Sequence, residues 1–278
     1  MITNKQLKLI RQLEQKKFRR KEGLFVAEGP KVVGDLMARW TPSAVFAVDG
    51  YQPPLSADNR ALYDSSRIQR ISDDELRRIS FLQHPQQVLA LFPIPQPPST
   101  INHHPSPTTH HPSPITQHPS PTTPSPLILA LDGVQDPGNL GTIIRLADWF
   151  GIETIICSEA TADVWNPKVV QATMGSIARV SVVYTNLAAY IDALPTDVPV
   201  YGTLLDGNNI YDEELTEGGI IVMGNEGNGL TNEIRRRVTR RLLIPSYRTE
   251  TAESLNVAIA TAIVCAEFRR RGSACQQR

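Results

Sequence analysis

Cysteine is scarce in this chain, and the few cysteines lie far apart. Only Cys157, Cys265 and Cys275 occur, and no two of them form a CxxC pair. This spacing excludes a disulfide framework and a cysteine zinc site, and it fits a reducing compartment. The chain also lacks an apolar run of the ~18 residues that a membrane helix needs, and its charged N-terminus lacks the apolar core of a signal peptide. We therefore expect a cytoplasmic protein without a membrane segment.

Two common nucleotide-binding signatures are missing as well. The chain contains neither the GxGxxG pattern of dinucleotide-binding folds nor the GxxxxGK[ST] pattern of a P-loop. Their absence weighs against an ordinary doubly wound enzyme that uses NAD or ATP. The formal net charge is zero, so overall charge favours no particular partner, and only the distribution of charge is informative.

One stretch of the chain has no charged residue at all. Residues 93–126 contain no Asp, Glu, Lys or Arg but hold twelve of the 22 prolines, and an HPSP unit recurs every seven residues. Such a segment cannot bury a core, so we expect an extended linker of polyproline type that permits wide separation of its flanks. Five histidines lie in it, but without acids or cysteines beside them a spacer is favoured over a metal site. The linker predicts an α/β domain over residues 1–92 and a second domain over residues 127–278.

Apolar patterning predicts strands and helices on both sides of the linker. In the first domain we expect a helix at 5–17, a strand at 24–27, a helix from 29 to 40, a strand at 44–48, a helix at 73–80 and a strand at 88–92. In the second domain we expect strands at 127–131, 154–157, 178–184, 200–205, 220–223 and 241–244. Between and after these strands we expect helices at 139–150, 167–174, 187–194 and 254–271. Near-continuous apolar strands that alternate with helices favour a parallel sheet covered on both faces.

Positive charge is concentrated in two runs. Residues 5–21 hold eight Lys and Arg against the single acid Glu14. A second run, residues 235–241, holds five arginines. Basic runs bind nucleic-acid phosphates, although a solvated helix face is an equally good reading of either run alone.

Three stretches of the second domain carry chemistry. The first motif (DGVQDPGNLGTIIR, 132–145) turns from a strand into a helix, with Asn139 as the expected N-cap. The second motif (MGNEGNGL, 223–230) is a glycine loop after a strand, in which Glu226 is unusual because a turn needs no carboxylate. The third motif (IPSYRTETAESLNVAIA, 244–260) places Ser254 at the expected start of the last helix. Alone, each is explained as well by a capped turn or a tight loop.

The order and spacing of the three motifs resemble the SpoU (TrmH-like) branch of the SPOUT methyltransferases. The resemblance covers about 127–271, with a looser match at 16–36 to the substrate-binding domain of many members. It implies transfer of a methyl group from S-adenosylmethionine to a ribose 2′-hydroxyl in RNA. Ribosomal RNA is the expected target, and transfer RNA is the alternative. It also implies a homodimer and a C-terminal trefoil knot, which base rates alone argue against.

The resemblance also implies roles for individual residues. The catalytic residues that it implies are Asn139, Arg145, Glu226, Ser254 and Asn256. The cofactor-binding residues are Thr203, Gly224, Gly229, Ile244 and Leu255. For RNA binding, the basic N-terminal run suggests Lys16, Lys17, Arg19 and Arg20. No metal is expected, because the sulfonium already activates the methyl group.

Two other classes of function stay open at this point. One is a non-catalytic RNA-binding or ribosome-assembly protein, which the intact set of polar motif residues disfavours. The other is the NAD or ATP enzyme considered above, which the missing signatures disfavour. Titrations with S-adenosylmethionine, NAD and ATP separate these classes.

Overall fold

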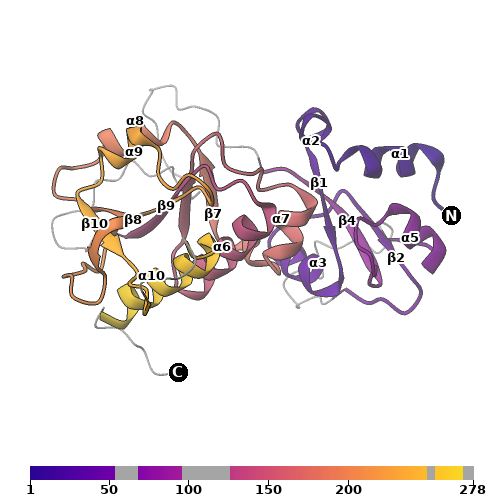
Figure 1. Cartoon of the computed structure of the whole chain (residues 1–278). Coiled ribbons are helices and arrows are strands. Elements are labelled where there is room, and N and C mark those ends of the chain that lie inside the picture. Colours follow the sequence, from indigo (N-terminus) through magenta and orange to yellow (C-terminus); the bar gives the residue numbers. More distant parts are fainter. Residues whose placement is uncertain (54–67, 96–125, 249–253, 272–278) are drawn as a thin grey trace, which may run out of the picture.

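The structure is a computed structural model that describes residues 1–53, 68–95, 126–248 and 254–271 (Figure 1). It contains two β-sheets, one on each side of the proline-rich segment. The expected linker lies almost wholly outside the described residues, since only 93–95 and 126 of it are described. No helix in the described ranges combines the length and the apolar character that crossing a membrane requires.

The N-terminal sheet has four strands in the order β1-β4-β2-β3. Their bounds are β1 Leu24–Glu28, β2 Ala44–Ala47, β3 Ile68–Arg70 and β4 Val88–Pro93. Strand β4 pairs antiparallel with β1 and β2, and β3 pairs parallel with β2. The three strands expected in this domain are confirmed. Strand β3 was not expected, because its three residues IQR carry too little apolar signal to predict a strand.

Helices cover this sheet, and the first of them corrects an expectation. The bounds are α1 Asn4–Gln12, α2 Lys16–Glu22, α3 Pro30–Met37 and α5 Asp73–Ile79. The single helix expected at 5–17 is therefore wrong, because the chain breaks between α1 and α2. The Arg19 guanidinium stabilises that break: its Nη1 donates to the carbonyls of Leu13 at 2.8 Å and Glu14 at 2.6 Å. These carbonyls are left without helical partners where α1 ends.

The C-terminal sheet has six strands, all parallel, in the order β10-β8-β9-β5-β6-β7. Their bounds are β5 Leu127–Asp132, β6 Thr154–Cys157, β7 Ser181–Tyr184, β8 Val200–Asn209, β9 Gly219–Gly224 and β10 Arg240–Leu243. This confirms the expected parallel sheet. The strand order reverses between β5 and β9, and ligands of open parallel sheets bind at such a reversal, outside the carboxyl ends of the strands.

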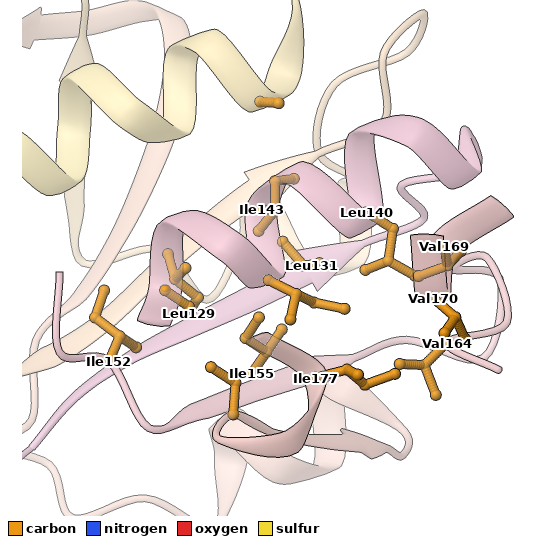
Figure 2. Packing of buried hydrophobic residues seen from close by; sticks show 14 of the residues in the cluster. Leu129, Leu131, Leu140, Ile143, Ile152, Ile155, Val164, Val169, Val170 and Ile177 are labelled. Atoms are coloured by element: carbon orange, nitrogen blue, oxygen red, sulfur yellow. The ribbon is translucent and has the colours of Figure 1, made fainter. Parts of the chain in front are cut away.

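Five α-helices and a short 3-10 helix accompany this sheet. Their bounds are α6 Pro137–Trp149, α7 Pro167–Ala172, η2 Ser176–Ala178, α8 Leu187–Asp192, α9 Asn232–Arg235 and α10 Val257–Arg271. Figure 2 shows buried side chains of α6 pointing toward β5 and α7. Gly141 permits this close packing, because a Cβ there would lie 2.5 Å from the Cβ of Ala172.

Two helix starts differ from the expectation. Helix α6 begins at Pro137, and its N-cap is Asp136, which accepts a 2.7 Å hydrogen bond from the amide of Asn139. Helix α10 begins at Val257, and Asn256 rather than Ser254 caps it, accepting from the amides of the second and third helical residues. The first shift leaves the Asn139 side chain free of a capping role. The second fixes the Asn256 side chain at the start of α10.

The two sheets are parts of one packed molecule (Figure 1). The Phe25 ring in β1 lies 4.6 Å from the Trp165 ring, centroid to centroid, and Trp40 packs against both. Arg19 forms an ion pair with Asp163 across the same boundary. The proline-rich segment would permit wide separation, but these contacts hold its flanks together. The trefoil knot stays a prediction, because residues 249–253, between β10 and α10, are not described.

Candidate active site

The first and second motifs begin side by side at the carboxyl ends of neighbouring strands. Asp132, the last residue of β5, is paired in register with Gly224, the last residue of β9. Strand β8 lies on the other side of β9, and the hydroxyl of Thr203 in β8 donates to the carbonyl of Val222 at 3.3 Å. The fold thus gathers the loops after β5, β8 and β9 at one edge of the sheet.

Glu226 of the second motif binds the turn of the first. Its carboxylate accepts hydrogen bonds from the backbone amides of Gln135 and Asp136, both at 3.3 Å, and from Nδ2 of Asn139 at 3.0 Å. Partial burial works to raise the pKa of Glu226, but the hydrogen bonds from Asn139 and from backbone amides outweigh it and lower the pKa. Glu226 is therefore a charged acceptor that holds the first turn.

Asn139 also forms a hydrogen bond with the third motif. Its Oδ1 accepts a 2.9 Å hydrogen bond from Nδ2 of Asn256. The Oδ1 of Asn256 accepts from the amides of Ala258 at 2.9 Å and Ile259 at 3.3 Å, at the start of α10. Glu226, Asn139 and Asn256 thus form a chain of hydrogen bonds, which we call the three-motif ladder. Because each asparagine uses both ends of its amide within the protein, these residues fix the geometry of the site.

The glycine loop between β9 and α9 is tightly closed. The amide and carbonyl of Asn225 bond to those of Gly229, both at 2.9 Å. A Cβ on Gly224 would lie 2.3 Å from the carbonyl carbon of Gly229, and Gly229 has a φ of +67°. Only glycine fits the first position, and the second strongly favours it. The Nδ2 of Asn225 also donates to the carbonyl of Gly133 at 2.8 Å, which ties this loop to the first motif.

Two polar residues of the site carried no expected role. Asp132 is only 4% exposed, and its Oδ2 accepts a 2.7 Å hydrogen bond from the amide of Thr231, directly after the glycine loop. Asn225 binds Gly133 as described. The signal for Asp132 was available in the sequence, since a carboxylate ends the otherwise apolar strand LILALD and a buried charge needs a specific partner.

The ladder does not include Arg145 or Ser254. Arg145 is exposed on α6, and neither a hydrogen bond nor an ion pair joins it to another described residue. Ser254 is exposed before α10. Of the expected cofactor residues, Gly224 and Gly229 form the glycine loop, Thr203 lies beside it, Ile244 is half-buried after β10 and Leu255 is exposed. Among the described residues the side chains of Arg145 and Ser254 are free to contact a ligand, whereas the ladder residues are already hydrogen-bonded to one another.

Arg19 corrects the expected set of RNA-binding cations. Its side chain is 2% exposed, and it is committed to Asp163 and to two backbone carbonyls. Lys16, Lys17 and Arg20 are exposed on the same helix. The second basic run is largely neutralised within the protein, by ion pairs of Arg235 and Arg241 with Asp206, of Arg237 with Asp192 and of Arg240 with Glu213.

Comparisons with known proteins agree with this geometry. Residues 126–266 match the model of the SpoU rRNA Methylase family, and residues 4–90 match that of an MRM3-like substrate binding domain. Over 269 residues the chain is 29% identical to the 23S rRNA (guanosine(2553)-2′-O)-methyltransferase RlmP of Bacillus subtilis (strain 168), with 96% of each protein covered.

Two solved structures share the whole fold. A protein of Porphyromonas gingivalis, assigned to the TrmH family of RNA methyltransferases, superposes with a TM-score of 0.78 at 36% identity, covering 98% of this chain and 100% of that one. The AdoMet-bound rRNA methyltransferase of Sinorhizobium meliloti superposes with a TM-score of 0.76 at 31% identity, covering 97% and 96%. Because the family model matches more than half of its length, this chain belongs to the SpoU rRNA methylase family.

Proposed function

We propose that this protein transfers a methyl group from S-adenosylmethionine to a ribose 2′-hydroxyl of ribosomal RNA. The observation that carries the proposal is the three-motif ladder, in which Glu226, Asn139 and Asn256 join three separate loops at the carboxyl edge of a parallel sheet. Relatives that span nearly the whole chain include a 23S rRNA 2′-O-methyltransferase and an rRNA methyltransferase with bound AdoMet. Transfer RNA is the alternative substrate.

The residues at the strand ends fit S-adenosylmethionine. A Cβ on Gly229 would meet no atom within 4 Å, so a flat ring can approach the loop backbone closely. Leu255 presents an exposed apolar side chain beside the ladder residue Asn256, and Thr203 adds a hydroxyl within β8, bonded to Val222 of β9. An open backbone, an apolar side chain and a hydroxyl are together suited to bind the flat ring of the cofactor. Gly224, Gly229, Thr203, Ile244 and Leu255 would hold the cofactor.

The main task of the protein in this reaction is to orient the ribose 2′-hydroxyl toward the methyl group of the cofactor. The bound cofactor supplies a methyl group activated by its sulfonium. The 2′-hydroxyl must then lie in line with that methyl and lose its proton. Burial raises the pKa of the Cys157 thiol at the end of β6 to about 12, so it does not act as the base. Arg145 and Ser254 have side chains free to contact the ribose and its phosphate, while the ladder holds the loops that present them.

A homodimer is part of the proposal. Helices α6 and α10 pack side by side against the sheet and expose apolar side chains, with Trp149 84% and Ile259 54% exposed. Apolar residues occur all round α10, which is typical of a helix buried on more than one side. A second copy packed on this surface would cover Trp149 and Ile259 and would bring Arg145, on the same helix as Trp149, to the interface.

Purified protein, labelled S-adenosylmethionine and total RNA from a strain lacking the gene test the function directly. We expect saturable cofactor binding and a new alkali-resistant 2′-O-methylated linkage in ribosomal RNA. Label in transfer RNA would establish the alternative substrate. RNA binding without cofactor binding would establish a non-catalytic protein. Binding of NAD or ATP in place of S-adenosylmethionine would instead indicate an enzyme that uses one of those nucleotides. Fractionation of the source cells tests the expected cytoplasmic location.

A further inference from the structure

A cleft of about 1120 Å³ separates the two sheet-bearing parts of the molecule. One wall comes from α2 and the end of β4, and the other from β7 and the loop that follows β6. Its volume exceeds the ~300–1,000 Å³ of ordinary small-molecule pockets. Its size therefore favours a polymer segment over a metabolite.

The α2 wall is positively charged. Lys16 and Arg20 line the cleft, and both are exposed. They stand four residues apart and so lie on one face of the helix. No ion pair with another described residue neutralises either of them. Arg19 also lines the cleft, but its charge is neutralised by Asp163, and Glu159 is the remaining acid of the lining.

The opposite wall carries apolar side chains along β7, which has a free strand edge. Strand β7 is the last strand of its sheet, so one of its edges is unpaired among the described strands. Val183 in this strand is 42% exposed. Tyr184 lines the cleft as well, and its hydroxyl accepts a 2.8 Å hydrogen bond from the amide of Val164, which fixes the ring. Trp165 adds a second aromatic side chain. Cations opposite fixed aromatic rings are the combination that binds single-stranded nucleic acid.

The loop after β6 lies between the cleft and the candidate active site and contacts both. Glu159 and Asp163 of this loop line the cleft. Ser158, at the start of the same loop, accepts a 2.9 Å hydrogen bond from the amide of Gly133, and the Ala162 amide donates to Val134 at 2.8 Å. Gly133 and Val134 belong to the first motif. A strand lying in the cleft therefore lies against the loop that supports the first motif.

We propose that this cleft binds a single-stranded segment of the RNA substrate, with phosphates against Lys16 and Arg20 and bases against Val183, Tyr184 and Trp165. The inference rests on the proposed function and adds to it a path for the RNA. It also separates the exposed cations of α2 into two pairs. Lys16 and Arg20 line the cleft, whereas Lys17 and Lys21 do not.

The division gives a matched test. Lys16→Ala/Arg20→Ala and Lys17→Ala/Lys21→Ala remove the same charge from the same helix. We expect the first variant to weaken binding of a short oligouridylate and to reduce the slope of log affinity against log salt by about 1.4, the share of two phosphate contacts on a single strand. The second variant should keep a slope close to wild type. Equal losses in the two variants would overturn the cleft and leave only nonspecific attraction.

A second pair of variants tests the opposite wall. Val183→Glu places a carboxylate in the cleft, whereas Val183→Thr keeps the branched side chain that suits a strand. Oligouridylate affinity should fall in the first and be retained in the second, with unchanged thermal unfolding and S-adenosylmethionine binding in both. An RNA duplex should bind with no difference among these proteins; a duplex that shows the same losses would overturn the single-strand assignment. Failure of the wild type to methylate any RNA would count against the proposed function, whereas normal rRNA methylation by all variants would count against the cleft alone.

Discussion

Arg19 and Asp163 form an ion pair between residues that lie 144 positions apart in the chain. Nε and Nη2 of Arg19 both donate to Asp163, and Nη1 donates to the two backbone carbonyls where α1 ends. One buried side chain therefore does two things. It fixes the break between α1 and α2, and it joins the N-terminal sheet to the loop that borders the first motif.

Arg19→Met should destabilise the protein much more than Arg20→Met. The first change leaves Asp163 and two carbonyls without their donor, and losing one member of a buried pair costs about 3 kcal/mol. The second removes an exposed cation without an ion pair among the described residues. Denaturant unfolding of the two variants measures the difference. Equal free energies of unfolding would mean that the ion pair contributes nothing.

The charge of Glu226 should make cofactor binding and the three-motif ladder sensitive to acid pH. Its pKa is lowered in the folded protein from the ordinary value of 4.5. A carboxylate with a lowered folded pKa stabilises the fold fully above its unfolded pKa, and this stability is lost as pH falls through the folded pKa. Cofactor binding and the ladder should therefore weaken as pH falls below the ordinary value of 4.5 and then through the lowered pKa of Glu226. Glu226→Gln should bind cofactor less tightly at pH 7, and its remaining affinity should not show this acid dependence. Parallel pH profiles would contradict the role of the charge.

Arg145→Ala should lower methyl transfer on the order of a hundredfold, because positioning and electrostatic interactions with the ribose and phosphate are lost. Stability should change by under ~1 kcal/mol, since the side chain is exposed and Ala is a good helix former. Arg145→Lys keeps the charge but not the planar fork, so it should stay impaired. Turnover, cofactor binding and thermal unfolding are measured on the same samples. Near-normal turnover of Arg145→Ala would exclude the mechanism.

Asp132 should affect cofactor affinity without contacting the reacting atoms. Asp132→Ala leaves the amide of Thr231 without its acceptor, and an unsatisfied buried donor costs roughly 1–3 kcal/mol. Because Thr231 follows the glycine loop, we expect a higher KM for S-adenosylmethionine and a smaller effect on kcat. Asp132→Asn keeps an acceptor and should restore most of the affinity. A variant Asp132→Ala that changes kcat alone would assign the carboxylate to the chemistry instead.

The sequence predicted the parallel sheet well because its central strands, β5 and β9, are buried on both faces. Runs such as LILAL at 127–131 and the strand before the glycine loop need no tertiary information to be recognised. Helix starts were harder, since Asp136 and Asn139 are both good caps and lie in the same turn. Only the backbone geometry shows that Asp136 caps α6 and that Asn139 is left to bind Glu226 and Asn256.

Contacts between distant residues could not be read from local pattern. Arg19 lies in a run of exposed cations and differs from Arg20 in facing Asp163 and the carbonyls at the end of α1. The ladder was implied by the resemblance as a set of residues, without its connections. The order in which Glu226, Asn139 and Asn256 bond comes from loops that are far apart in the chain, and nothing in their local sequence encodes it.

The pairing of β5 with β9 has a consequence for synthesis on the ribosome. The two strands are separated by β6, β7 and β8, and β5 lies in the middle of the sheet. A nascent chain that ends before residue 219 can complete the N-terminal sheet, but it leaves unpaired the edge of β5 that pairs with β9. N-terminal domains fold first during translation, and long-range strand pairing is slow. The candidate site therefore cannot assemble before β9 is made, and chains truncated before β9 would expose an apolar strand edge prone to aggregation.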